Sequence, residues 1–450
     1  MSELSATARR AVEAAVAAGA GDAEAYASRD SGREVRVHGG EVESLTAATQ
    51  SGIGVRAWIG RRVGYAFGTD LSEAGVAAIA ARATEAAAVA DEDEFASPPQ
   101  PAEIEPLAGL SDPTTADWSA DRVAELALSV ERTALAADSR IAGVEQAVYA
   151  DSAELVSIAS SAGVAGEYES SSCFAYLQAL AEGDGDRETG LGFGLARGPG
   201  GLDPVAIGAE GAERALAMIG ASKPPSRACP VVFDPTVAAS FAGLIGGALG
   251  ANAVQRGRSP FAGRLDEELA GEALALYDDG RDPEGAASAP FDGEGVPQRR
   301  TALIEGGCLR AYLYDTYTAN REGGSSTGSA SRHGYRSLPS VSTSNLVVAP
   351  GILDLQGLLA EAGNGIFVTD VAGLHSGVNP VTGVFSVGAS GRAIRDGALA
   401  EPLREFTIAG DLVSMLGSVK AAGAEARWIP FGGSVSAPPL LIGEMSISGS

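Results

Sequence analysis

Residues 291–332 read FDGEGVPQRRTALIEGGCLRAYLYDTYTANREGGSSTGSASR, in which an acidic turn, a strand-like run and a loop of small residues follow one another. Further strand-like runs with glycine-centred turns surround this block. They read SNLVVAPG, GIFVTDVAG, GVFSVGASGRAIRDG and PPLLIGEMSISG. Many strands, several such turns and few helices predict a barrel-like antiparallel β domain.

Helical segments interrupt these strands at only two places. The apolar strand PVVFDP leads into one long helix, TVAASFAGLIGGALGANAVQRG, and the second helix reads FTIAGDLVSMLGSVKAAG. The segment KPPSR, around residue 225, is the best candidate for a domain boundary. We therefore expect a C-terminal domain over residues 223–450.

The first half of the chain alternates hairpins and helices. Gly39-Gly40 and Gly60 each lie between alternating apolar and polar runs, which is typical of a β-hairpin. Helices are expected at the start of the chain, from Asp70 to about Ala90, over 119–137, and from Asp203 to about Gly220. Two further strands read VEQAVYADSAELVSIASSAG and EYESSSCFAYLQALAEG, and an acidic, proline-rich connection precedes the third helix. Residues 1–222 are thus predicted to form an α+β domain, an antiparallel sheet with helices on one face.

Charge and composition exclude several classes of function. The 450-residue chain has a formal net charge of −26, so contact with nucleic acid or anionic lipid is unfavourable on average. Three distant cysteines do not make a disulfide framework and suit a reducing cytoplasm. No stretch approaches the roughly 18 apolar residues of a membrane span. We expect a soluble cytoplasmic protein without direct nucleic-acid or membrane contact.

The small-residue loop raises three chemical possibilities. Gly324 to Gly328 match G-x-S-x-G with Ser326 in the nucleophile position, but no helix follows. A phosphate loop would need a lysine there, although Arg321 and Arg332 could hold an anion or a peptide carboxylate. The third possibility is a loop that only shapes a cleft.

Two other clusters were weighed as chemical sites. Asp292 and Glu294, beside Arg299 and Arg300, could act as a general acid and base, but a charged turn that fixes the next strand is the preferred interpretation. A catalytic zinc needs about three ligands, commonly two histidines on one helix. The histidines are His38, His333 and His375, too scattered for such a site.

The order of segments resembles the TldD/PmbA family, and more closely its PmbA (TldE) branch. The similarity covers most of the chain, and residues 291–332 carry it most specifically. It also includes GEVESLTAATQSGIGVRAWIGRRVGYAFGTD, RSPFAGRL, NLVVAPG, NPVTGVFSVGASGRAIRDGAL and SAPPLLIGEMSISG. The resemblance implies two domains assembled into a dimer around an internal cavity.

The same resemblance bears on metal binding. TldD-type subunits look like the zinc peptidases, with a His-Glu-three residues-His motif on the first long helix of the C-terminal domain and a cysteine near the end. Here that helix has no His, Glu or Cys, and the segment SVSAPPLLIGEM lacks cysteine. No metal ligand and no catalytic residue is carried over to this chain, and zinc is expected in the partner subunit.

The function implied is a non-metal-binding subunit of a heterodimeric TldD/TldE zinc metallopeptidase that cleaves unfolded or modified peptides. In it, Arg321, Ser325, Ser326, Thr327 and Asn379 would line the substrate cleft or contact the partner. The alternative is a metal-free homodimer that binds peptides or regulates without catalysis. The family name also refers to DNA gyrase; because the acidic charge gives no support to DNA contact, we expect such an effect to come from processing of a gyrase-directed peptide.

Overall fold

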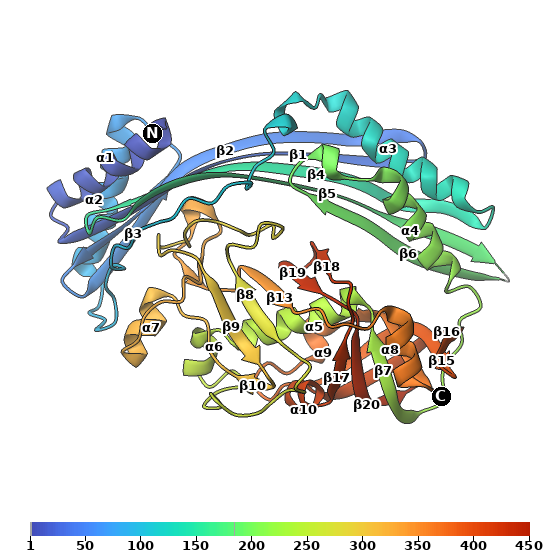
Figure 1. The fold of residues 1–450 in the computed structure, drawn as a ribbon. Helices are drawn as coiled ribbons and strands as arrows, with labels where there is room; N and C mark the ends of the chain where they lie inside the picture. The colour runs from blue at the N-terminus through green and yellow to red at the C-terminus, as the bar shows by residue number, and fades with distance from the viewer. Residues whose placement is uncertain (1, 184) are drawn as a thin grey trace.

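The computed structural model describes residues 2–183 and 185–450, with 26% of the chain in helices and 41% in strands. The predicted α+β class is confirmed. A long antiparallel sheet from the first half arches over the second half, which contains a closed barrel (Figure 1). Among the described helices, none is long and apolar enough to cross a bilayer.

Six strands in the order β3-β2-β1-β4-β5-β6 form the N-terminal sheet, and all neighbours are antiparallel. The strands are β1 (Asp22–His38), β2 (Glu41–Ile59), β3 (Arg62–Gly68), β4 (Ile141–Ser160), β5 (Ala165–Gly183) and β6 (Asp186–Ala196). Both predicted hairpins, at Gly39-Gly40 and at Gly60, are confirmed. The strand β6, DRETGLGFGLA, was missed because its glycines weaken the alternating pattern.

Two pairs of helices cover one face of this sheet (Figure 1). They are α1 (Glu3–Ala17) with α2 (Glu73–Val89), and α3 (Ala120–Ala137) with α4 (Pro204–Leu216). Small residues allow close packing at both ends of the sheet. A Cβ on Gly64 or on Gly190 would lie 2.2 Å from the backbone of α2 or α4. The convex face is thus the helical face, and the concave face is left for the rest of the chain.

Five strands close the C-terminal barrel in the order β16-β15-β14-β7-β20, with β16 also pairing with β20. They are β7 (Arg227–Phe233), β14 (Gly365–Ala372), β15 (Val384–Arg395), β16 (Ala398–Asp411) and β20 (Leu440–Ser448). Within these five strands, β7 and β14 pair parallel, and the other neighbours pair antiparallel. The predicted barrel-like domain is therefore present.

A second sheet has the order β10-β9-β8-β13-β19-β18. Its strands are β8 (Leu276–Asp279), β9 (Arg300–Glu305), β10 (Cys308–Leu309), β13 (Asn345–Val348), β18 (Arg427–Ile429) and β19 (Ser434–Ala437). Outside this sheet, β11 (Ala330–Ser331) pairs with β12 (Ser340–Val341), and β17 (Val419–Ala422) pairs with β20. The helices are α5 (Pro235–Ala248), α6 (Ala251–Gln255), α7 (Thr316–Glu322), α8 (Leu355–Ala362), α9 (Leu374–Gly377) and α10 (Leu412–Gly417), and three short 3-10 turns are η1 (Pro113–Asp117), η2 (Pro199–Gly201) and η3 (Gly334–Arg336). One apolar core joins the barrel, this sheet and α5.

Three expected helices differ in the structure. The long helix after β7 breaks after Ala248, because Gly250 is extended and Ala251 bonds to the Leu313 carbonyl. FTIAGDLVSMLGSVKAAG is mostly strand, since Phe406 and Ile408 alternate into the core, and only α10 is helical. Ser72 and not Asp70 caps α2.

Candidate functional site

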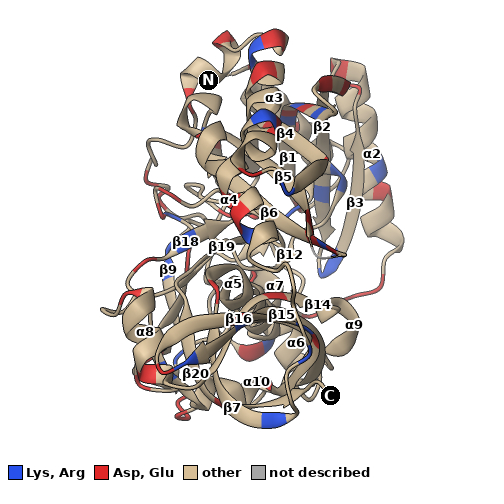
Figure 2. Ribbon diagram, turned by 90° about the vertical axis from the view of Figure 1, so that its right-hand side faces the viewer, with Lys and Arg blue, Asp and Glu red and all other residues tan. Residues whose placement is uncertain are grey.

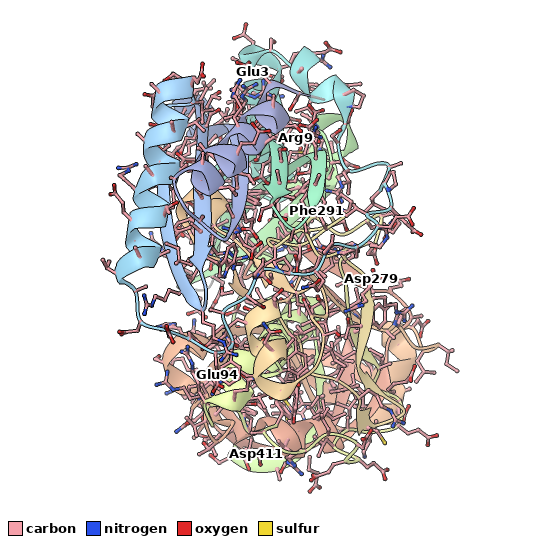
Figure 3. All side chains as sticks on the ribbon, turned by 90° about the vertical axis from the view of Figure 1, so that its left-hand side faces the viewer. Glu3, Arg9, Glu94, Asp279, Phe291 and Asp411 are labelled. Carbon is pink, nitrogen blue, oxygen red and sulfur yellow. The ribbon has the colours of Figure 1, made fainter. Side chains whose placement is uncertain are left out.

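The concave face of the N-terminal sheet rests on the block 291–332. Phe291, 1% exposed, packs edge-on against Tyr168 of β5, with ring centroids 5.2 Å apart. It lies at the junction of the two halves (Figure 3). Gly166 leaves room for it, because a Cβ there would lie 2.5 Å from the Phe291 ring. The acidic turn at the start of the block is therefore buried in the interface.

A cavity of about 210 Å³ lies at this junction. Its walls come from both halves of the chain and are mostly polar. They include Tyr26, Glu154, Tyr168 and Ser170 of the sheet, and Asp292, Gln298, Ser329, Arg332, Ser342 and Ser344 of the second half. A larger hollow of about 610 Å³ contains Arg33 and Asp151, but these two form an ion pair with each other. We take the smaller cavity as the candidate site.

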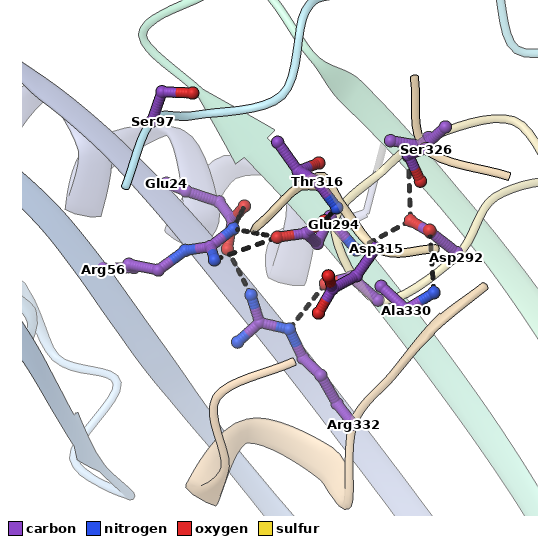
Figure 4. A network of polar contacts seen from close by, with 12 residues as sticks. Glu24, Arg56, Ser97, Asp292, Glu294, Asp315, Thr316, Ser326, Ala330 and Arg332 are labelled. Carbon is purple, nitrogen blue, oxygen red and sulfur yellow. Dashed lines mark hydrogen bonds and ion pairs between the residues drawn. The ribbon is translucent and has the colours of Figure 1, made fainter. Parts of the chain in front are cut away.

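Four charged side chains form a buried network beside the cavity (Figure 4). Arg56 of β2 binds Glu24 of β1 at 2.7 Å and Glu294 of the acidic turn at 3.0 Å. Arg332 binds the other oxygen of Glu24. Two positive and two negative charges balance, and no side chain in the network is more than 10% exposed. The network links the sheet to the second half of the chain.

The acidic turn is held by the backbone as well. The Thr316 amide, at the start of α7, donates to Glu294 at 2.8 Å. Burial alone would raise the pKa of Glu294, but Arg56 and this amide outweigh it and lower the pKa. Glu294 is thus an anion whose charge is already neutralised, and it is not a free general base.

Asp292 lies next to the cavity and fixes the loop around it. Its carboxylate accepts hydrogen bonds from the amides of Glu294, Val296 and Ala330, at 2.8 to 3.0 Å. Burial and the nearby Glu294 raise its pKa well above the usual range. The preferred sequence interpretation, a charged turn that positions the following strand, agrees with this geometry. The two arginines that follow in the sequence make other contacts: Arg299 donates to loop carbonyls, and Arg300 lies over the Tyr277 ring, 3.6 Å from its centroid.

Two more carboxyl groups near the cavity titrate close to neutrality. Burial, with a contribution from Asp30, raises the pKa of Glu154 to about 7. Burial also raises the pKa of Asp278 to about 7, although the amide and hydroxyl of Ser344 donate to it. The lining of the cavity therefore changes charge within the physiological range of pH.

The predicted cleft residues of the loop lie beside the cavity and do not line it. Ser326 donates to the Tyr314 carbonyl at 3.1 Å and accepts from the Gly328 amide at 3.1 Å. The Thr327 hydroxyl accepts from the Tyr314 amide at 2.7 Å. These bonds fold the loop onto the chain before α7. Ser325 is exposed.

The remaining predicted residues lie apart. Arg321 is exposed on α7, with its guanidinium 5.7 Å from the Phe95 ring centroid. Asn379 accepts from the amides of Val381 and Thr382, and so shapes its own turn before β15. Of the predicted site residues, the structure therefore brings only Ser326 and Thr327 together, through their bonds to the Tyr314 backbone. Arg332 is not available to an anion from outside, since its side chain is 1% exposed and bound to Glu24.

Sequence reasoning missed Glu24 and Arg56, which are more than 230 residues from Glu294 in the chain. A single signal was present: both are charged residues within strands whose neighbours are apolar, and buried charges require partners. Which partners they meet follows only from the arch of the sheet over residues 291–332.

The residues present do not fit a zinc site. All three histidines are exposed and lie on different elements. Over residues 2–183 and 185–450, no three His, Cys, Asp or Glu side chains are grouped so that they could hold a metal ion. The less buried face of α5 carries Thr236, Ser240, Gly243 and Gly247, none of which is a usual metal ligand.

A long antiparallel sheet arches over a second half that contains a closed barrel, and a polar cavity lies between the sheet and residues 286–344. This architecture defines the class of the protein. Three domain profiles of one family match in order: PmbA/TldA metallopeptidase domain 1 at residues 23–87, the central domain at 113–219 and the C-terminal domain at 226–449. The chain belongs to the PmbA/TldD family, in its PmbA branch.

The chain is similar to named relatives from both branches of the family. Metalloprotease PmbA of Escherichia coli O157:H7 is 29% identical over 95% of this chain and 92% of that protein. A TldD homologue from Haemophilus influenzae is 25% identical over 89% and 87%. The fold matches the crystal structure of TldE from Thermococcus kodakarensis with a TM-score of 0.92 at 22% identity, over 98% of this chain and 100% of that one.

Proposed function

We propose that this chain is the metal-free, TldE/PmbA-type subunit of a heterodimeric zinc metallopeptidase that cleaves unfolded or modified peptides. Its role is to complete the substrate chamber, while a TldD-type homologue supplies the zinc. The observation that carries the proposal is the composition of α5. This helix and α6 offer no His, Glu or Cys at the place where the family resemblance puts the zinc motif.

The buried network supports a structural and not a chemical role for this chain. Asp292 in the cavity wall and Glu294 beside it are each held by several hydrogen bonds within the fold. Ser326 bonds to a backbone carbonyl and not to a histidine. The name metalloprotease carried by the PmbA relatives supports a part in proteolysis.

The experiment is native mass spectrometry of the chain purified gently from its own cells, with peptide hydrolysis measured in parallel. We expect a mass of this chain plus one similar-sized homologue, and one zinc that leaves with the homologue. Hydrolysis should need both chains. This chain alone, with added zinc, and the homologue alone are the matched controls.

Other outcomes distinguish the alternatives. A metal-free homodimer that binds unfolded peptide would contradict the proposal and favour a binding or regulatory protein. Zinc-dependent hydrolysis by this chain alone, at the rate of the complex, would also overturn it. The net charge of −26 opposes direct action on DNA, so gel-shift with duplex DNA at physiological salt should be negative.

A further inference from the structure

Half of the strand β2 is an open edge of the N-terminal sheet. The strand β3 pairs with β2 only from Ile53 to Ile59. Residues 41–50 are all exposed, and no described strand pairs with their outer side. In Figure 2, β2 and β3 stand at the edge of the sheet. An edge of about ten residues is long enough to accept a whole strand.

The register shows which amides point outward along this edge. Ser161 donates to the Ala23 carbonyl and the Arg33 amide donates to Asp151, so odd-numbered residues of β1 face β4. Even-numbered residues of β1 then face β2, where Gly32 pairs with Ala48. In an antiparallel ladder the residues of a hydrogen-bonded pair face each other. Even-numbered residues of β2 in this stretch therefore face β1, and odd-numbered residues face away from it. The free N–H and C=O groups of β2 therefore belong to Leu45, Ala47, Thr49 and Ser51.

The edge is fixed in place and is not protected against pairing. The amides of Gly39 and Gly40, at the hairpin tip, each donate to buried Glu131 of α3 at 2.8 Å. Natural edge strands commonly carry Lys, Pro or a charge that prevents pairing. Glu41 and Glu43 place charge at one end of the edge, but residues 44–52, SLTAATQSG, have none of these. Such an edge is a preformed acceptor for another strand.

We infer that residues 43–51 of β2 bind the corresponding edge strand of the homologous partner subunit, so that one sheet runs through both chains. This inference rests on the proposed heterodimer. A homologue with the same fold presents the same edge, and a pseudo-twofold axis near Ala47 pairs the two edges antiparallel. In that register Glu43 lies across from the position of Ser51, so the acidic ends of the two strands do not meet. The edge can pair with its counterpart without a change of fold in either chain, and Ala47 to Thr49 at its centre also line the larger hollow that contains Arg33 and Asp151.

The experiment is residue-resolved amide hydrogen exchange on the chain alone and in its complex with the TldD-type homologue. We expect the amides of Leu45, Ala47, Thr49 and Ser51 to exchange quickly in the lone chain and at least tenfold more slowly in the complex. The even-numbered amides of Thr46, Ala48 and Gln50 should be protected in both. Unchanged exchange at the odd-numbered positions in an intact complex would overturn the inference.

A variant tests the same edge by affinity. Ala47→Pro removes an outward amide and should raise the Kd of the complex at least tenfold, because proline suits an edge strand whose N–H faces away from the sheet. Ala47→Ser keeps the amide and is the matched control. If Ala47→Pro lowers the Tm of the lone chain, Ala47→Lys replaces it.

A wild-type chain that forms no heterodimer refutes the proposed function. An intact heterodimer whose Kd is unchanged by both variants refutes only the inference about this edge. Protection of the odd-numbered amides by an unfolded peptide alone would make the edge a substrate site and also contradict the inference.

Discussion

Glu154 lies on β4, next to the cavity, with a pKa of about 7 that results from burial and from Asp30. An unfolded glutamate loses its proton near pH 4.3. Between that pH and about 7 the folded state holds the extra proton. The free energy of unfolding therefore falls as pH rises through this window, and the loss is complete above pH 7.

Glu154→Gln should remove this dependence. Between pH 5 and 7, we expect the Tm of the wild type to fall relative to the Tm of the variant. Above pH 7.5, the difference between the two Tm values should stay constant. Thermal unfolding followed by circular dichroism at closely spaced pH values measures this. Glu145→Gln, at an exposed position of the same strand, is the control and should leave the profile unchanged. Identical profiles for wild type and Glu154→Gln would contradict the assignment.

Arg56 bridges two carboxylates from opposite sides of the junction. Arg56→Gln leaves Glu24 and Glu294 buried with less compensation, and removal of one partner of a buried ion pair typically costs about 3–5 kcal/mol. Urea unfolding should show a loss of that size. Arg62→Gln, which breaks the exposed pair with Glu92, should change the free energy of unfolding by less than about 1 kcal/mol. Equal effects of the two changes would contradict the role of the network.

At the scale of elements, the 3-10 turn η3 docks onto the concave side of β2 and β3. Gly52 and Gly54 make room for it, and a Cβ on Gly52 would lie 2.3 Å from the Tyr335 ring. A Cβ on Gly54 would lie 2.2 Å from the Tyr65 hydroxyl and 2.4 Å from the Tyr335 carbonyl, and the Tyr65 hydroxyl donates to that carbonyl. The segment 334–337, and with it Arg332, depends on this close approach.

Gly54→Ala should therefore destabilise the protein and loosen the segment around Tyr335. The expected loss is about 1–3 kcal/mol, as for other overpacked sites. Limited proteolysis near His333, together with urea unfolding, measures both effects. Gly143→Ala, in β4 of the same sheet, has open space around the new methyl group and should be neutral or slightly stabilising. A neutral Gly54→Ala would show that η3 is not docked as described.

The sequence predicted most elements whose patterns are local. The hairpins of the first half, α3 and the strands β7, β13 and β20 follow from alternation, caps and turns. The failures have physical reasons. Burial in the barrel overrides helical spacing in β16, and backbone bonds to residue 313 divide the helix that becomes α5 and α6.

The candidate site was less accessible to such reasoning. Residues 291–332 were recognised as the key block, and Asp292 was given its correct place in a turn. The network could not be foreseen, because Glu24 and Arg56 meet Glu294 only through the curvature of the sheet. The predicted roles of Arg321, Ser325, Ser326, Thr327 and Asn379 in cleft or partner contact stay predictions.

At the scale of the whole molecule, the two predicted domains share buried charges. If the chain is divided at 222/223, Glu24 and Arg56 lose Arg332 and Glu294. We expect a single cooperative unfolding transition for the full chain in calorimetry, and a marked loss of stability for residues 1–222 alone. Two well-separated transitions, or an N-terminal fragment as stable as the full chain, would show instead that the halves are independent.

The closure of the barrel has a consequence for biosynthesis. The strand β20 pairs with β7, the first strand of the barrel, and also with β16. A nascent chain that has been translated only to residue 439 thus exposes both unpaired edges and the apolar interior of an open barrel. The barrel must therefore wait for residues 440–448 to leave the exit tunnel before it can close. During that interval the chain is a natural client for chaperones that shield apolar surface.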